Sequence, residues 1–561
     1  MSSPAPLNQS AASHSAETGP ILAHRGRRAD YVALGCGLTL ASVAALCFFH
    51  SRNEILLSGD AVAHINIARH VFDSRTPGLL QLGSVWLPLP HLLTIPFVVD
   101  NSMWQSGIGG SIISMLSYVC AGLGLFRLLS IWSRTAAWLG TAVFAANPNL
   151  LYVQTTALNE PLYLAAFLWA TVCFTEAFRR FGRDDAGAAR WLQYGAVALT
   201  AGVFTRYDGW FLACVSWIVI APRLLASLRK AAASEFRRGV VKALLLTALG
   251  PTLWLAYNFG VYGNPLEFAN GPYSAKAIAQ RTTQPGAPPY PGKDHVLTAG
   301  TYFIKAAQLN IGDSRLARII VLLAVCGSAA GLVRGLGPIV VLLWSPVAFY
   351  ALSIAYGSVP IFLPVWWPFS YYNARYGLEL LPAIAAGIAL LIHTAQGVAS
   401  RQRLRWLAVL LLGVGVVTYW QCWRQVPLCL RETRANGAAR MEIDAKLSEA
   451  LKALPPKSTV LAYTGAHSGA FELAAFPLRQ TINEGNLYIW DASLTLPAMS
   501  ADYIVACAGD PVAEAVARHP GYLRLVAKFD VHGEQPIALY RSDLRPPRAK
   551  TSYRLSVLSY P

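Results

Sequence analysis

Eleven apolar runs, each long enough or nearly long enough to cross a bilayer, constrain this chain more than any other feature of its sequence. An α-helix rises about 1.5 Å per residue, so roughly 20 apolar residues cover a hydrocarbon core about 30 Å thick. Only 13% of the residues are charged, against about a quarter in a soluble domain. We therefore predict a mainly α fold, a bundle of about eleven membrane spans at residues 31–49, 108–129, 135–151, 160–178, 191–205, 208–222, 240–261, 316–333, 338–356, 376–395 and 406–423.

Short basic clusters between the apolar runs indicate how the bundle is oriented. HRGRR precedes the first run, and the later clusters are FRRFGRDDAGAAR, PRLLASLRKAAASEFRR and RQRLR. The positive-inside rule places these clusters in the cytoplasm. The net charge of +17 is therefore a topology signal, because the basic residues are scattered and form no surface for nucleic acid. We predict a multi-pass protein of the inner (plasma) membrane whose N-terminus is cytoplasmic.

The same rule decides two ambiguous segments, because basic loops on one side must be separated by an even number of crossings. The stretch WLQYGAVALTAGVFTRYDGWFLACVSWIVIAP lies between two basic loops, so we predict two short spans hinged at Arg206–Gly209. Counting WLPLPHLLTIPFVV as a span would move Arg127 and Arg134 outside. This segment is short and rich in proline, so we predict an interfacial or re-entrant segment instead.

The loops and soluble parts follow from this topology. From about residue 430 the chain changes character, since STVLAYTG and DYIVACAG are typical of buried strands between helical stretches. We predict a disordered cytoplasmic tail at 1–30, a transmembrane module at 31–425 with outer loops at 50–107, 262–315 and 357–375, a small extracytoplasmic α/β domain at 430–545, and a tail at 546–561.

The stretch LLSGDAVAHINIARHVFDS follows directly on the first span and predicts a helix lying along the membrane surface. Apolar residues recur at helical spacing on one side, and the other side carries Asn66, Arg69, His70 and Asp73. Asp60 stands at the N-terminus of this helix, and His64 lies one turn further on the same face. We expect this carboxylate and imidazole to converge on a site at the outer membrane boundary.

Purely structural roles remain open for both residues. Asp60 suits an N-cap, which accepts hydrogen bonds from the first free backbone donors, although the neighbouring Ser58 can cap as well. A capping role and a catalytic role for Asp60 are compatible. An interfacial histidine such as His64 is often only packed or solvated.

These motifs together resemble the GT-C superfamily of integral membrane glycosyltransferases. The similarity rests on GDAVAHINIARH, the Pro-rich WLPLPH, the run TTALNEP at the outer end of the third span, and SYYNARYGLELLPAIAAG, which opens a late span. The nearest patterns are those of the protein O-mannosyltransferases and the lipid A aminoarabinose transferases, of the glycosyltransferase family 39 type. The chain departs from the family at Ala61, where a second acidic residue often follows the loop aspartate. No metal site is therefore predicted; a divalent metal is possible but not indicated, and no cofactor is expected with certainty.

The resemblance implies a glycosyltransferase that moves a hexose or pentose, with inversion, from a polyprenyl-phosphate donor to a lipid, glycan or protein outside the cytoplasm. In such a reaction a carboxylate takes the proton of the incoming hydroxyl, and a cationic side chain stabilises the departing phosphate. Asp60 is the implied base. The implied donor- and phosphate-binding residues are Arg375, Arg206 and Lys305, and the candidates for a second carboxylate or an acceptor contact are Glu160, His64 and His91.

Each of the main candidates also has a simpler explanation. Arg375 stands among tyrosines and could anchor its helix at the lipid headgroups. Arg206 could pair with Asp208 in the hinge between two spans. Glu160 precedes Pro161 at a helix start, where an acidic residue favourably meets the helix dipole.

Two parts of the chain offer polar residues without a predicted role in the chemistry. The second outer loop is rich in Pro, Gly and Tyr, so it is either a lid over the outer cavity or a mobile segment. The C-terminal run TGAHSGAFELAAFPLRQTINEGNLYIW is predicted to belong to an accessory domain without chemistry, although it offers His467, Glu472, Asn483 and Glu484.

A transporter or flippase of a cell-envelope precursor is the main alternative to an enzyme. Transporters usually place ionisable residues in the middle of spans and often show matched halves. Here the charged candidates stand mostly at the outer ends of spans, and no second half repeats the first. A third alternative is an assembly subunit with a membrane anchor, although the long, charged first outer loop exceeds what an anchor needs.

Overall fold

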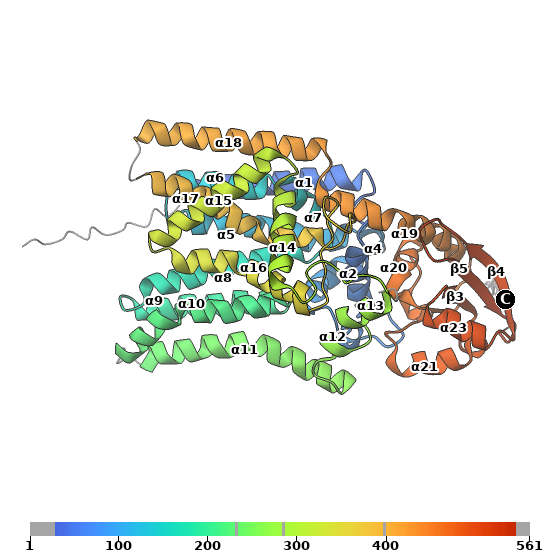
Figure 1. The fold of residues 1–561 in the computed structure, drawn as a ribbon. Coiled ribbons are helices and arrows are strands. Elements are labelled where there is room, and N and C mark those ends of the chain that lie inside the picture. The colour runs from blue at the N-terminus through green and yellow to red at the C-terminus, as the bar shows by residue number, and fades with distance from the viewer. Residues whose placement is uncertain (1–27, 231–233, 283–285, 397–399, 546–561) are drawn as a thin grey trace, which may run out of the picture.

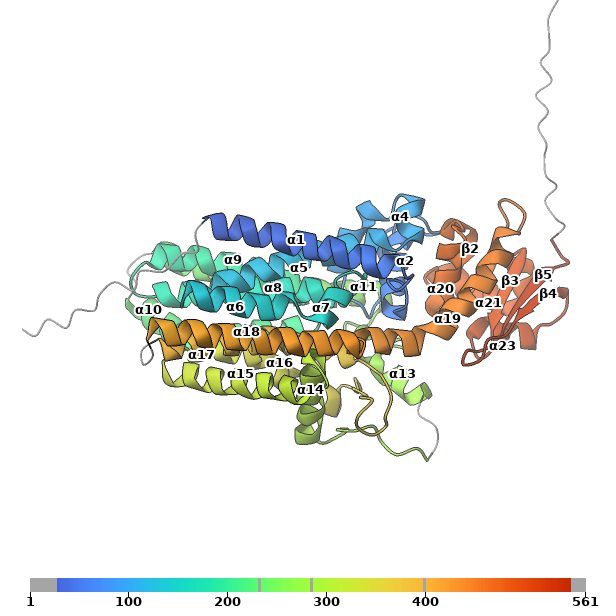
Figure 2. The same cartoon turned by 90° about the horizontal axis from the view of Figure 1, so that it is seen from above.

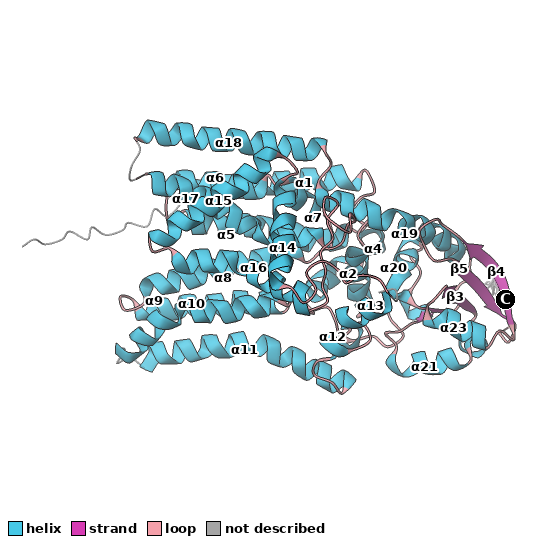
Figure 3. Cartoon of the chain, in the orientation of Figure 1, coloured by secondary structure: helices cyan, strands magenta, loops and turns pink. Residues whose placement is uncertain are grey.

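The computed structural model describes residues 28–230, 234–282, 286–396 and 400–545. The predicted tail at 546–561, and residues 1–27 of the predicted tail at 1–30, lie outside these described residues. Long helices lie side by side and form most of the molecule, whereas the strands gather at one end of it (Figures 1 and 3).

Each predicted span coincides with a helix or a pair of helices. These are α1 (Arg28–His50), α5 (Ile108–Leu129), α6 (Arg134–Ala145) with α7 (Pro148–Val153), α8 (Glu160–Arg180), α9 (Asp185–Val203), α10 (Asp208–Lys230), α11 (Ser234–Tyr262), α15 (Arg315–Val333), α16 (Gly337–Tyr356), η3 (Ala374–Leu380) with α17 (Leu381–Ala395), and α18 (Arg401–Arg424). Within the described residues, nine helices are long and apolar enough to cross a membrane. The mainly α, polytopic fold is therefore confirmed, and the chain is a multi-pass membrane protein.

Two predicted spans are not among these nine helices. The run at 135–151 is divided into α6 and α7 at Pro148, because proline lacks the N–H that would continue the helix. Helix α9 begins six residues before the predicted run and includes charged residues there, which lower the mean hydropathy of the helix. Both elements nevertheless lie alongside the longer helices of the bundle (Figures 1 and 2).

Short elements gather at the end of the bundle that faces the strands (Figure 1). They are α2 (Gly59–His70), η1 (Leu79–Leu82), α3 (Leu89–Thr94), η2 (Ile95–Phe97), α4 (Asn101–Gln105), α12 (Glu267–Asn270) and α13 (Ala275–Thr282). The Pro-rich segment forms only α3 and η2, so it is not a membrane span. A further helix, α14 (Val296–Ile311), crosses the direction of the long helices (Figures 1 and 2).

Helix α19 (Leu428–Lys452) leads from the bundle into a small α/β unit (Figure 2). The five strands have the order β2-β1-β3-β5-β4; β1 pairs parallel with β2 and β3, and β5 pairs antiparallel with β3 and β4. The predicted C-terminal α/β fold is confirmed. Its elements are β1 (Val460–Ala462), α20 (Thr464–Leu473), η4 (Leu478–Gln480), β2 (Thr481–Ile482), α21 (Leu487–Thr495), α22 (Pro497–Ser500), β3 (Tyr503–Cys507), α23 (Pro511–Arg518), β4 (Leu523–Phe529) and β5 (Ile537–Ser542).

The amphipathic pattern of α2 predicts a helix that lies on an open membrane surface. In the structure the polar side of α2 is buried instead. Its polar residues Asn66 and Arg69 are 2% and 8% exposed. Asn66 donates to Glu472 of α20 at 2.6 Å, and Arg69 donates to the carbonyl oxygen of Val98 at 2.7 Å. The C-terminal unit and the first outer loop therefore bury the polar side of α2, and their hydrogen bonds replace water.

One glycine permits the close approach of α19 to the segment before α2. A Cβ at Gly437 would lie 1.9 Å from the carbonyl oxygen of Leu57. We expect Gly437→Ala to lower the melting temperature of the purified protein, since overpacking costs about 1–3 kcal/mol. Gly413→Ala is the control, because a Cβ there meets no atom within 4 Å. Equal melting temperatures for the two variants would contradict this packing.

Candidate active site

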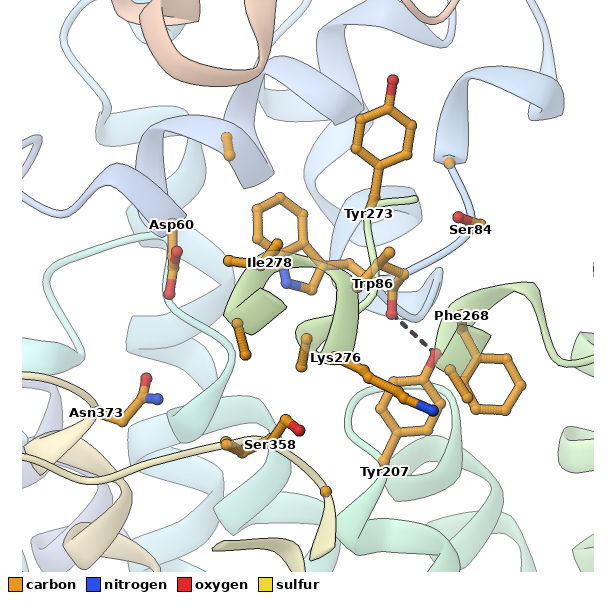
Figure 4. Close-up of a pocket in the computed structure, with 18 of the residues that line it drawn as sticks. Asp60, Ser84, Trp86, Tyr207, Phe268, Tyr273, Lys276, Ile278, Ser358 and Asn373 are labelled. Carbon is orange, nitrogen blue, oxygen red and sulfur yellow. Dashed lines mark hydrogen bonds between the residues drawn. The ribbon is translucent and has the colours of Figure 1, made fainter. Parts of the chain in front are cut away.

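A cavity of about 3000 Å³ lies where the bundle meets the C-terminal unit (Figure 4). Helix α2 and the loop after it line one side, and the ends of α8, α10 and α16 that lie nearest the C-terminal unit line another. Helices α12 and α13 of the second outer loop, the start of η3, and the C-terminal unit complete the lining. Residues from distant parts of the sequence therefore share one cavity.

Asp60 and Arg375 form an ion pair in this cavity. The N-cap position of α2 belongs to Ser58, so Asp60 lies in the first turn and its side chain reaches the guanidinium of Arg375. Arg375 Nε also donates to Glu160 Oε1 at 3.0 Å, and its backbone N–H donates to Glu432 Oε2 at 3.3 Å. Arg375 is thus held from three sides by carboxylates.

Arg206 lies in the hinge between α9 and α10 and occupies a second cluster. Its guanidinium lies 3.1 Å from Glu160 Oε1, 3.2 Å from Asp208 Oδ2 and 3.1 Å from Glu379 Oε1. The Tyr350 hydroxyl accepts from Arg206 Nη2 at 2.9 Å and lies 2.8 Å from Glu379 Oε1. Glu160 contacts both arginines and joins the two clusters.

The two arginines face five carboxylates, those of Asp60, Glu160, Asp208, Glu379 and Glu432. Buried charges must be paired, and paired groups in a low dielectric hold one another firmly. The side chains of Glu160 and Glu379 are 1% and 0% exposed, whereas that of Asp60 is 43% exposed. Asp60 is therefore the carboxylate of this group that a molecule in the cavity can reach most readily.

His64 lines the cavity, and His91 lies behind it. His64 Nδ1 lies 2.8 Å from His91 Nε2, and the Asn159 side-chain amide donates to His64 Nε2 at 3.0 Å. An amide donor at Nε2 leaves the proton of neutral His64 on Nδ1, where it is donated to His91. The ring of His64 also lies 4.6 Å from that of Trp86. These hydrogen bonds and the ring contact fix the imidazole of His64 in one orientation.

Burial keeps these imidazoles neutral. It lowers the pKa of His64 to about 3, with a further contribution from the charges of Arg375 and Arg206. Burial also lowers the pKa of His70 to about 4, and it lowers the pKa of His91 well below its usual range. His64 therefore cannot supply a proton as an imidazolium near neutral pH.

This burial predicts sensitivity to acid. Below the unfolded pKa of about 6.5 the unfolded chain takes up protons that the folded chain does not, so stability falls as the pH drops from about 6.5 toward the folded values. At pH 5 each such histidine costs about 2 kcal/mol. We expect His70→Gln to flatten the decline in melting temperature between pH 7.5 and 5, whereas His519→Gln, at an exposed position, should not. Parallel curves for wild type and His70→Gln would contradict this prediction.

The structure brings most of the sequence-predicted candidates together. Asp60, His64, Glu160, Arg206 and Arg375 line the cavity. His91 contacts the cavity residue His64 but is not part of the lining. Lys305 lies elsewhere, where its Nζ donates to Gln308 at 2.6 Å and lies 5.6 Å from the ring centre of Trp366.

Sequence reasoning missed several residues of the site. Glu379 follows Arg375 by four residues, and an acidic residue inside a predicted span is itself a functional signal. Glu432 carries no such signal, because nothing near it in the sequence places it beside Arg375. Lys276 projects into the cavity from α13 toward Tyr207 (Figure 4). Residues of the second outer loop therefore form part of the cavity wall.

Among the residues that the structure describes, no group of three or more His, Cys, Asp and Glu side chains is arranged to hold a metal ion. The carboxylates of the site instead contact guanidinium groups. The groups available for polar chemistry are thus the accessible carboxylate of Asp60 and the two fixed guanidinium groups of Arg375 and Arg206.

Comparison with known proteins shows a similar fold at low sequence identity. No family model matches the chain, and no curated protein does. The crystal structure of ArnT from Cupriavidus metallidurans bound to undecaprenyl phosphate matches with a TM-score of 0.56 and 13% identity, over 93% of this chain and 100% of that one. The apo structure of ArnT matches with a TM-score of 0.54 and 13% identity, over 91% and 98%.

An oligosaccharyltransferase from Archaeoglobus fulgidus also matches, with a TM-score of 0.43 and 12% identity, over 86% of this chain and 69% of that chain. The two ArnT matches show that this chain shares the fold of ArnT, as the resemblance drawn from the short motifs implies.

Proposed function

We propose that this chain, which has the fold of the GT-C membrane glycosyltransferases, is an inverting glycosyltransferase that uses a polyprenyl-phosphate sugar as its donor. The observation that carries this proposal is the Asp60–Arg375 pair in a cavity that is also lined by apolar residues of the membrane helices α10 and α16. A base, an anion-binding group and an apolar surface for the lipid then line the same cavity.

Apolar residues of two membrane helices line part of the cavity and would hold the lipid chain of the donor. Helix α10 contributes Trp210 and Phe211 to the lining, and α16 contributes Phe349, Leu352 and Tyr356. Apolar side chains on membrane-spanning helices suit an isoprenoid chain, which remains in apolar surroundings when it moves from the bilayer to such a surface. The ArnT structure of the same fold holds undecaprenyl phosphate, which supports this assignment.

The reaction is a single displacement. The acceptor hydroxyl oxygen forms a bond to the anomeric carbon while the bond from that carbon to the phosphate oxygen breaks. Asp60 takes the hydroxyl proton, and the polyprenyl phosphate leaves with the electron pair. Arg375 and Arg206 stabilise the negative charge that develops on the leaving phosphate.

The buried carboxylates would act as positioning groups for the two arginines. A guanidinium held by Glu160 and Glu379 loses little side-chain entropy when phosphate binds, since its orientation is already fixed. A bound phosphate would compete with Asp60 for Arg375. The donor would thereby release the carboxylate that the acceptor needs, so the base would become free when the donor is in place.

This function sets the orientation of the chain. The site and the C-terminal unit would lie outside the cytoplasm, and the basic clusters and the N-terminus would lie inside, in the plasma membrane. The acceptor would be a lipid, glycan or protein that presents a hydroxyl, and the transferred sugar would be a hexose or a pentose.

The proposal is tested with the full-length protein in lipid nanodiscs. Native mass spectrometry should detect bound polyprenyl phosphate, and radiolabelled sugar should pass from membrane polyprenyl-phosphate donors to an acceptor fraction. Donor sugar that crosses the bilayer in proteoliposomes without being transferred would overturn the proposal in favour of a flippase. Failure to bind any polyprenyl phosphate would overturn it as well.

A further inference from the structure

The cavity is too large for a donor headgroup alone. Ligand sites usually occupy about 300–1000 Å³, and this cavity holds about 3000 Å³. The proposed chemistry uses the part of the cavity around Asp60. It gives no role to the part formed by the C-terminal unit and the second outer loop. We call its five residues Tyr273, Tyr463, Asn483, Glu484 and Trp490 the outer wall; all of them line the cavity.

Aromatic rings and hydrogen-bond acceptors stand close together in the outer wall. The rings of Tyr463 and Trp490 have centres 6.4 Å apart, inclined at 39°. Both oxygens of the Glu484 carboxylate accept from Thr464, from its N–H and its hydroxyl at 2.9 Å each. Burial and the neighbouring Glu484 raise the pKa of Tyr273 to about 12, so its hydroxyl stays protonated and can donate.

The loop that carries Asn483 and Glu484 is fixed to the membrane module. Gln81 donates to the carbonyl oxygen of Gly485 at 3.0 Å, and the Asn486 amide donates to Thr76 Oγ1 at 3.0 Å. Segments some 400 residues apart in the chain thus build one rigid surface. A preformed surface binds at a lower entropic cost than a mobile one.

We infer that the outer wall is the acceptor subsite and that its ligand is a neutral saccharide; this inference rests on the proposed glycosyltransferase function. Sugar rings present polarised C–H bonds on their faces, which pack on the negative face of an aromatic ring. Their hydroxyl groups donate to carboxylate oxygens such as those of Glu484. The carboxylates of Glu484 and Asp491 repel an anionic acceptor.

The position of the outer wall favours a saccharide over a lipid or a peptide. The wall belongs to the part of the molecule that extends beyond the long helices (Figure 1), so an acceptor reaches it from the aqueous side. One common mode of peptide binding adds an extended peptide to the edge of a sheet. The residues of the C-terminal unit that line the cavity lie instead on α20, on α21, in the loop between β2 and α21 and, for Tyr463, directly between β1 and α20.

The experiment measures binding of the full-length protein in nanodiscs to immobilised neutral oligosaccharides built from glucose, galactose, mannose or N-acetylglucosamine, with unmodified peptides alongside. We expect at least one of these saccharides to bind. Tyr273→Ala should weaken that binding at least about tenfold, as should Trp490→Ala. Tyr488→Ala is the matched control, because this tyrosine on α21 is 88% exposed and is not part of the lining.

Several results would overturn the inference: no saccharide bound by the wild type, peptides or lipids bound in their place, or equal affinity in Tyr273→Ala. Trp490 is largely buried, so its removal also leaves a cavity that destabilises the fold. Tyr273→Ala, at a 40% exposed residue in the second outer loop, is therefore the deciding variant. Polyprenyl phosphate binding is measured in parallel. If the wild type binds no polyprenyl phosphate, the proposed function fails. If it binds polyprenyl phosphate but no saccharide, only the acceptor subsite fails.

Discussion

Replacing Asp60 with asparagine is expected to reduce sugar transfer at least about 100-fold, with little change in melting temperature. A positioned base contributes about 10²–10⁴ in rate, and an amide of the same shape cannot accept the acceptor proton. The side chain of Asp60 is 43% exposed and makes no capping bond. Its removal therefore leaves the helix start intact, so any loss of transfer reports on chemistry rather than on folding.

Glu449→Gln is the matched control for this experiment. Glu449 is an exposed carboxylate on α19 whose surface ion pair with Lys452 contributes little to stability. Transfer is measured at equal amounts of protein, and polyprenyl phosphate binding is measured in the same samples. Full transfer by Asp60→Asn would remove Asp60 from the mechanism and reduce it to an ion-pair partner of Arg375.

The residues of the site that the sequence predicts share one property, which is a charge at a helix end next to an apolar run. Asp60, Glu160, Arg206 and Arg375 all stand at such positions. Charges are costly in lipid, so a charge at the edge of a span marks either an interfacial anchor or a site. The hydropathy pattern therefore locates the candidates, and the shared cavity in the structure brings them together.

The burial of α2 could not be predicted from its own pattern. A helix with one apolar and one polar side is typical of a membrane surface. The partner of Asn66 is Glu472, 406 residues further along the chain, and no local signal connects them. Burial of Glu472 raises its pKa to about 8, so this side chain is largely protonated when it meets Asn66 near neutral pH. The fold of the C-terminal unit thus decides the environment of the helix that carries Asp60.

Arg375→Lys is expected to weaken polyprenyl phosphate binding at least about tenfold while the protein remains folded. Lysine keeps the positive charge but cannot present two parallel N–H groups to phosphate oxygens. Arg375→Ala should lose more binding, and it should also lower stability, because removing one partner of a buried ion pair costs about 3–5 kcal/mol. Glu160 and Glu432 would then both lose Arg375 as a partner, and only Glu160 would keep a second cation, Arg206.

The lysine variant is therefore the informative one, and Arg434→Lys is its control. Arg434 also pairs with a carboxylate, that of Glu54, but it is not part of the cavity lining. Binding of polyprenyl phosphate to Arg375→Lys with wild-type affinity would show that charge alone suffices. Wild-type affinity in a folded Arg375→Ala variant would remove Arg375 from the donor site altogether and leave phosphate recognition to Arg206. A loss in Arg375→Lys without a loss in Arg434→Lys would place the phosphate at the guanidinium that holds Asp60, as release of the base by the donor requires.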